Sequence, residues 1–122
     1  MNIKEKMNSF VAICHKASSD AGWWENKADI HTDVNIVPSK LCLIHSEVSE
    51  AMEGHRKGLM DDKLPHRSMI EVELADAMIR IADLAGALDL DIGGAIDEKM
   101  AFNAQRADHK PENRAAVGGK TY

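Results

Sequence analysis

The stretch IEVELADAMIRIADLAGAL, residues 70–88, decides how this chain folds. Its apolar residues recur at the spacing of an α-helix and cover one side of that helix and much of the other: Ile70, Leu74, Ala77, Met78, Ile81, Leu84, Ala85 and Leu88, then Val72, Ala75, Ile79 and Ala82. A helix that is apolar nearly all round is typical of a buried position. The polar residues form one narrow strip, which we expect to line a site in the interior: Glu73, Asp76, Arg80 and Asp83.

A second helix-compatible segment, residues 39–55, carries a matching pair of carboxylates. Glu47 and Glu50 are three residues apart, as are Glu73 and Asp76, so each pair faces one way from its helix. Glu47 also lies at the edge of an apolar stripe, which places it away from a purely solvated face. Carboxylates that are brought together and stripped of water are unfavourable by several kcal/mol each unless they are paired or bind a metal.

Ligands that are all oxygen suit Mg²⁺, with Mn²⁺ as a substitute, and do not suit zinc. We therefore expect a metal site whose four ligands are Glu47, Glu50, Glu73 and Asp76. The alternative is that both acidic pairs belong to solvated helix faces, since glutamate is rarely buried.

Length and charge limit the class of protein. A chain of 122 residues is expected to form one domain that is modest for a stand-alone enzyme, so oligomerisation would help to bury its apolar faces. The net charge of −5 argues against a nucleic-acid-binding surface. The two cysteines, Cys14 and Cys42, have no metal-ligand spacing and are expected to be free thiols in a reducing cytoplasm. No apolar run is long enough for a membrane span.

The N-terminal part is predicted to be an amphipathic helix over residues 3–18, followed by a break at 18–22. The adjacent Trp23 and Trp24 offer a stacking wall for a nucleobase, because aromatic faces accept bases without hydrogen bonds. The alternative is that the two rings cap the core, and the sequence favours neither.

The middle of the chain contains several helix boundaries. Residues 25–38 show no sustained period and are predicted to be a loop or a short helix. Pro38 disfavours helix before it and Ser39 is a good N-cap, so the second helix is expected to start there. This helix should end near Arg56, because Gly58 stands where a C-terminal stop belongs.

A basic connection over residues 55–67 leads to the third helix, which is predicted to begin near Ser68. The connection either attracts a triphosphate or is a solvated loop. Asp91 is expected to cap a fourth helix, on which an apolar stripe continues into Lys99, Asn103 and Arg106. Ammonium, amide and guanidinium groups suit phosphate oxygens, although basic residues at a helix end also interact favourably with the helix dipole.

With these motifs in view, the sequence resembles the MazG-like, all-α nucleoside triphosphate pyrophosphohydrolases. The resemblance covers most of the chain, and its most specific part is an ExxE motif followed, after residues 51–72, by an ExxD motif. The other matching positions are Gly22, Trp23, Trp24, Lys99, Asn103 and Arg106. In two respects the chain departs from the family pattern: Ser46 stands where many members have an additional glutamate, and a long stretch separates the Gly-Gly-Lys motif at 118–120 from Arg106.

The resemblance implies an all-α, four-helix-bundle-type domain over residues 1–110, assembled as a homodimer or homotetramer, with an irregular tail over 111–122. It also implies Mg²⁺ on the four carboxylates and hydrolysis of a nucleoside triphosphate to a monophosphate and pyrophosphate. Lys99, Asn103 and Arg106 match the family's phosphate-contacting positions. A carboxylate that is not fully used by the metal would take a proton from water, and we assign this role to Glu50.

Two other classes compete with this hypothesis. Carboxylate-bridged di-iron or di-manganese oxidoreductases are also four-helix bundles, but they use Glu-x-x-His motifs, and no histidine takes that position beside either acidic pair. The other class is a non-catalytic helical module that binds a metal or a partner. Affinity for Mg²⁺ that depends on the carboxylates would distinguish an enzyme from a module that only binds a partner.

Overall fold

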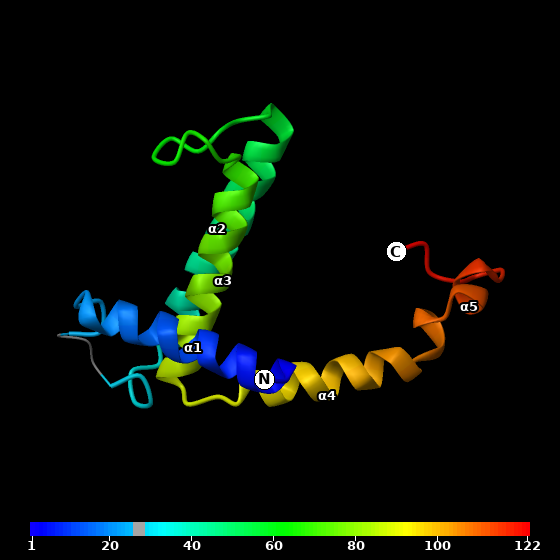
Figure 1. Ribbon diagram of the computed structural model, residues 1–122, viewed down its shortest axis with the longest axis horizontal. Coiled ribbons are helices and arrows are strands. Elements are labelled where there is room, and N and C mark those ends of the chain that lie inside the picture. Colours follow the sequence, from blue (N-terminus) through cyan, green and yellow to red (C-terminus); the bar gives the residue numbers. More distant parts are fainter. Residues whose placement is uncertain (26–28) are drawn as a thin grey trace. The chain divides into compact units, whose positions relative to one another are not determined.

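The computed structural model describes residues 1–25 and 29–122, and every regular element in these residues is helical (Figure 1). In chain order the elements are α1 (Ile3–Asp20), α2 (Ile36–Lys57), α3 (Met69–Ala87), α4 (Ile92–Gln105), the 3₁₀ turn η1 (Ala107–His109) and α5 (Pro111–Ala115). The all-α prediction is therefore confirmed for the described residues. Part of the predicted irregular segment 25–38, residues 26–28, lies outside them. The chain divides into two compact units, one of residues 9–90 and one of residues 1–8 and 91–122.

In the unit of residues 9–90, α2 and α3 pack side by side (Figure 1). The end of α2 follows the prediction, because Gly58 adopts the left-handed conformation with φ 62° and its N–H donates back to the helix. The start of α3 does so too, since the Ser68 side chain accepts a hydrogen bond of 3.3 Å from the N–H of Glu71. Because α2 and α3 pack against each other, their carboxylates lie on neighbouring helices.

The predicted start of α2 is wrong. The helix begins at Ile36, three residues before the predicted cap Ser39, and the N–H of Ser39 donates to the carbonyl of Asn35 at 3.1 Å. Pro38 lies in the first turn, where the N–H that proline lacks would have no partner within the helix. The helix can therefore begin before Pro38, although proline disfavours helical backbone at the residue that precedes it.

The prediction that α3 is buried nearly all round is wrong for the single chain. The buried positions on α3 are a narrow set: Glu73, Ala77, Ala82, Leu84 and Ala85. Larger side chains on the same helix stay exposed, with 47% for Leu74, 54% for Met78 and 45% for Ile81. These three residues share one helix face, which we call the α3 apolar face. Helix α2 has a comparable α2 apolar face, made of Leu41, Val48 and Met52.

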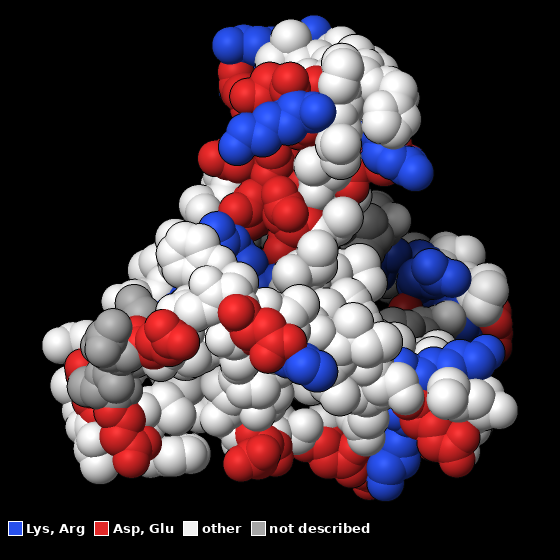
Figure 2. All heavy atoms as spheres, turned by 60° about the vertical axis from the view of Figure 1, so that its left-hand side comes forward, with Lys and Arg blue, Asp and Glu red and all other residues white. Residues whose placement is uncertain are grey.

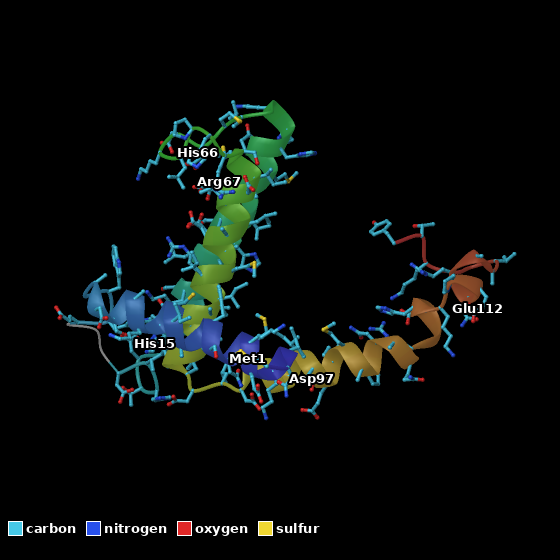
Figure 3. The ribbon with its side chains drawn as sticks, viewed as in Figure 1. Met1, His15, His66, Arg67, Asp97 and Glu112 are labelled. Atoms are coloured by element: carbon cyan, nitrogen blue, oxygen red, sulfur yellow. The ribbon has the colours of Figure 1, made fainter. Side chains whose placement is uncertain are left out.

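The C-terminal half of α1 approaches α3 closely at Gly86. A Cβ atom on Gly86 would come within 2.5 Å of the Cβ atom of His15, so only glycine permits this approach. Figure 3 labels His15 on α1. The contact brings His15 next to Asp83 of α3, where its Nδ1 lies 2.8 Å from Asp83 Oδ1.

The other unit contains residues 1–8 and 91–122. As predicted, Asp91 caps α4, and its side chain accepts a hydrogen bond of 2.9 Å from the N–H of Gly94. Asn8 joins the two segments, since it donates to Asp91 and accepts from the N–H of Gly93, both at 2.8 Å. The tail after residue 110 is not wholly irregular, because it includes α5, which carries Glu112 (Figure 3).

None of the described helices is long and apolar enough to cross a membrane.

Candidate metal centre

Three of the four predicted ligands meet between α2 and α3. Glu47, Glu73 and Asp76 each place a carboxylate oxygen within 4.8 Å of the other two. Glu47 is 8% exposed and Glu73 is 9% exposed. Glu50, the fourth predicted ligand, is an exposed residue of α2 and does not belong to this cluster of three. Figure 2 shows acidic side chains gathered on the visible face of the upright α2–α3 pair.

Two oxygens of the cluster are buried without a hydrogen-bond partner among residues 1–25 and 29–122: Glu47 Oε2 and Glu73 Oε2. Leaving a buried acceptor without a partner is unfavourable by roughly 1–3 kcal/mol, and by more when it is charged. Such atoms in a folded protein call for an explanation, and binding of an ion is one possible explanation. The burial and the unpaired acceptors together are compatible with a cation held by this cluster.

The pKa values of the cluster show how it resolves like-charge repulsion without an ion. The neighbouring Glu47 carboxyl, burial and then Glu50 raise the pKa of Glu73 to about 8. The pKa of Glu47 is lowered, first by its hydrogen bond with the Glu73 carboxyl and then by Arg80, against the effect of burial. A proton held by Glu73 would therefore offset part of the repulsion between the two carboxyls. Burial, followed by the charge of Glu47, raises the pKa of Asp76.

Arg80 supplies a permanent positive charge to the cluster. Its Nε donates to Glu47 Oε1 at 2.9 Å, and the two side chains are 41% and 10% exposed. The sequence places Arg80 in the polar strip of α3 but gives it no role, because only a facing carboxylate on α2 reveals its partner.

A cavity of about 820 Å³ opens beside the cluster. One part of its wall is charged and includes Glu47, Asp76, Arg80 and Lys40; another part is apolar and includes Leu43 and Ile79. Trp23 also lines the cavity and is 66% exposed, which fits a stacking wall better than a capped core. The volume is within the usual range of small-molecule sites.

Trp24 has a different role from Trp23. Its Nε1 donates to Asp83 Oδ1 at 3.0 Å, its ring packs edge-on against His15 at 5.7 Å between centroids, and Lys40 lies over it at 4.6 Å. Asp83 therefore ties the tryptophan segment to α3. For Trp24, the structure supports the packing alternative that the sequence left open.

A second cavity of about 680 Å³ also reaches the cluster, through Glu73 and Asp76. Glu50 and Asp61 lie in its wall. Asp61 is 7% exposed, and its Oδ2 accepts hydrogen bonds from the N–H groups of Lys63 and Leu64 at 3.0 and 2.8 Å. The burial of Asp61 was not predicted, because the sequence of residues 55–67 is typical of a solvated basic connection. The only signal was an Asp two residues before Lys63 in a turn.

The basic connection itself is largely engaged with surface carboxylates. Lys57 pairs with Glu53 at 2.7 Å and Arg67 pairs with Glu71 at 3.0 Å. Figure 3 labels His66 and Arg67 in the loop between α2 and α3. These contacts support the solvated-loop alternative for Lys57 and Arg67.

The predicted phosphate-binding residues belong to the unit of residues 1–8 and 91–122, and the carboxylate cluster belongs to the unit of residues 9–90. Arg106 donates to both carboxylate oxygens of Asp108, at 3.1 and 2.8 Å, and to Asn103 at 3.4 Å. Lys99 lies over the Phe102 ring at 4.8 Å. Asn103 and Arg106 thus meet, whereas Lys99 packs on an aromatic side chain.

Lys120 completes the cluster around Asp108, since its Nζ lies 2.9 Å from Asp108 Oδ2. Together, Lys120 and then Arg106 lower the pKa of Asp108 to about 2. The tail lysine therefore pairs with the same carboxylate as the last basic residue of the predicted phosphate stripe.

Comparison with known protein families, with curated proteins and with solved structures finds no match to this chain. The chemistry of the site therefore depends on its own geometry: three clustered carboxylates, two of them buried, an arginine paired with one of them, and an adjoining cavity with both charged and apolar walls.

Proposed function

We propose that this chain is a Mg²⁺-dependent nucleoside triphosphate pyrophosphohydrolase of the MazG-like kind. The observation that supports it most strongly is the set of buried acceptors, Glu47 Oε2 and Glu73 Oε2, beside a cavity large enough for a nucleotide. A cation would satisfy these acceptors, and a polyphosphate is a ligand that binds through such a cation. The resemblance in sequence and the all-helical fold agree with the proposal.

The donor set fits Mg²⁺, since Glu47, Glu73 and Asp76 offer oxygens alone and no histidine or cysteine joins them among the described residues. We propose Glu50 as the fourth ligand. When bound, the ion would neutralise charge on the phosphate oxygens and acidify a water molecule.

The chain's own residues have separate roles in this proposal. Glu50 is the most exposed of the four carboxylates and therefore the one best able to take a proton from the attacking water. Trp23 offers its exposed ring to the base. Lys99, Asn103 and Arg106 are proposed to contact phosphate, and Arg106 would exchange its Asp108 partner for phosphate oxygens.

The same proposal includes a homodimer or homotetramer. The α2 and α3 apolar faces expose side chains such as Met52, at 63%, and Met78, at 54%. Two copies of the α2–α3 pair that bury these faces against each other would make a four-helix bundle, which a single pair cannot.

Assembly is testable by sedimentation at micromolar concentration. The wild-type chain should sediment as a dimer or tetramer, and Met78→Lys should shift it toward the monomer, because a charge in an apolar interface is unfavourable. Met100→Lys is the matched control, since Met100 is 60% exposed on α4, outside both faces. A monomeric wild-type chain contradicts the proposed assembly.

The reaction is tested with a panel of ribo- and deoxyribonucleoside triphosphates, Mg²⁺ and water labelled with ¹⁸O. The expected products are a monophosphate and pyrophosphate, and the label shows which phosphorus the water attacks. Release of orthophosphate would contradict the proposed cleavage. Binding of Mg²⁺ without turnover of any nucleotide would instead identify a non-catalytic metal-binding module.

A further inference from the structure

Within the part of the chain that the structure describes, the Arg80 guanidinium is hydrogen-bonded through Nε alone. Its Nε donates to Glu47 Oε1 at 2.9 Å, and in residues 1–25 and 29–122 neither Nη1 nor Nη2 has a hydrogen-bond partner. A guanidinium group carries five N–H donors in a planar fork, so most of its donors remain available. Because its side chain is 41% exposed, the available donors are accessible to a ligand.

The position of Arg80 relates it to the cavity and to the metal centre at once. It follows Asp76 by four residues, so the two side chains lie one turn apart on the same face of α3. Glu47, Asp76 and Arg80 all line the 820 Å³ cavity. A ligand in this cavity that bound a cation on the carboxylates would therefore lie next to a guanidinium group.

We propose that Arg80 is a phosphate-binding residue that couples the metal centre to its ligand: Nε holds Glu47, while Nη1 and Nη2 donate to oxygens of a di- or triphosphate bound through the cation. Arginine suits this double role because its fork can serve a carboxylate and a phosphate at the same time, whereas lysine supplies one point charge. The inference rests on the proposed function insofar as it takes a polyphosphate to be the ligand.

The alternative is that Arg80 only offsets the charge of Glu47. The two roles differ in what they do to cation binding and to phosphate binding. An arginine that only positions or neutralises Glu47 alters both affinities together. A phosphate-binding arginine alters the affinity for phosphate even where the affinity for the cation is kept.

The test measures two affinities of the full chain by calorimetry, first for Mg²⁺ alone and then for inorganic pyrophosphate at saturating Mg²⁺. In Arg80→Lys, which keeps a positive charge near Glu47, we expect the Mg²⁺ affinity to stay within about threefold and the pyrophosphate affinity to fall roughly tenfold or more, because a bidentate contact is lost. Arg80→Ala should weaken pyrophosphate by roughly tenfold to a hundredfold.

Arg67→Ala is the matched control. Arg67 lies just before α3, pairs with Glu71 at 3.0 Å and lines neither cavity described above, so both affinities should match those of the wild type. Circular dichroism melts of all three variants check that each is folded.

Parallel loss of both affinities in Arg80→Ala with full recovery in Arg80→Lys would overturn the inference, as would unchanged pyrophosphate binding. The readout does not depend on turnover. A wild-type chain that binds pyrophosphate through Arg80 but hydrolyses no nucleoside triphosphate would refute the proposed enzyme and keep the inference. If the chain hydrolyses nucleotides and its affinity for pyrophosphate does not depend on Arg80, the proposed enzyme is kept and the inference about Arg80 is refuted.

Discussion

Two clusters of charged side chains differ in how completely the protein satisfies them. Around Asp108, Arg106 and Lys120 supply hydrogen bonds and ion pairs to the carboxylate at 2.8–3.1 Å, and its pKa falls to about 2. In the cluster of Glu47, Glu73 and Asp76, carboxylates face one another, and the pKa of Glu73 rises to about 8. Two of its oxygens have no hydrogen-bond partner among the described residues. One cluster is neutralised from within the chain, and the other is neutralised only in part.

This difference is the one expected between a structural ion pair and a proposed binding site. A protein has little reason to bury like charges unless a ligand offsets them, because their desolvation is not repaid by the fold itself. An arrangement with its partners in place needs nothing from outside. The Asp108 cluster can therefore be explained as a set of ion pairs that holds the C-terminal tail. Ion pairing within the chain does not explain the α2–α3 cluster in the same way.

The largest expected effect comes from changing a carboxylate at the proposed metal site. Asp76→Asn removes a carboxylate of the Glu47, Glu73 and Asp76 cluster, and Glu50→Gln removes the carboxylate proposed as the fourth ligand. In either variant, Mg²⁺-dependent turnover should fall by roughly a thousandfold or more, given several kcal/mol of lost transition-state stabilisation. Helical content measured by circular dichroism should stay near that of the wild type. Glu71→Gln is the control, because Glu71 lies on the same helix α3 and pairs with Arg67 on the surface.

Near wild-type turnover in both ligand variants would exclude the proposed metal site. A thousandfold loss in Glu71→Gln as well would mean that any loss of charge on α3 is damaging, and the comparison between the two clusters would then carry no information about binding.

A smaller loss of activity is expected from changes at Arg106, in the Asp108 cluster, and at Lys99. If Arg106 contacts phosphate during turnover, Arg106→Ala should lower kcat/KM by roughly tenfold to a thousandfold, because a charge-assisted contact to the transition state is lost. Lys99→Ala should behave similarly. The measurement is steady-state kinetics on both variants, with thermal melts of the same samples.

Lowered melting temperatures with unchanged kinetics would show that the contact of Arg106 with Asp108 is structural and that the phosphates are bound elsewhere. Lys120→Ala sharpens this test, because it removes the other cation on Asp108 without touching Arg106. Arg106→Ala should then reduce kcat/KM far more than Lys120→Ala does.

Sequence patterns predicted the helices well where local chemistry decides the boundary. Gly58, Ser68 and Asp91 act as the end signals that their residue types indicate. The patterns failed at Pro38, where the first turn of a helix tolerates proline, and in the tail, where five residues form α5. They also failed for the exposure of Leu74 and Met78, since periodicity gives the apolar side of a helix and does not say what covers it.

For the site, spacing alone predicted that carboxylates of two helices would meet, and three of the four do. Spacing could not predict that Arg80 pairs with Glu47, because the contact joins residues 33 positions apart. It could not identify Asp61 either, whose burial depends on the fold of its loop. The residues of α4 alone could not predict that Asp108, which follows the helix, accepts hydrogen bonds from Arg106.

The last and smallest effect is a difference in the pH dependence of stability. A raised pKa means that the folded chain binds the Glu73 proton more tightly than the unfolded chain does. In EDTA, stability should therefore fall as pH rises from about 4.5 to about 8 and then level off. Asp108 has the opposite sign: its lowered pKa contributes stability above its ordinary value of 3.8, and this is lost as pH falls through about 2.

Two variants test these opposite signs. Glu73→Gln should melt higher than the wild type near pH 8 by a few degrees and converge with it near pH 4.5, since the amide donates to Glu47 at every pH. Asp108→Asn should differ from the wild type above pH 4 and converge with it near pH 2. Binding of Mg²⁺ should displace the proton that Glu47 and Glu73 share. Below pH 8, calorimetry in buffers of different ionisation enthalpy should therefore detect proton release when Mg²⁺ binds to the wild type, and none when it is added to Glu73→Gln. A wild-type melting temperature that is flat from pH 5 to 8 in EDTA, or Mg²⁺ binding without proton release, would mean that Glu47 and Glu73 do not share a proton, and the contrast between the two clusters would reduce to one of burial alone.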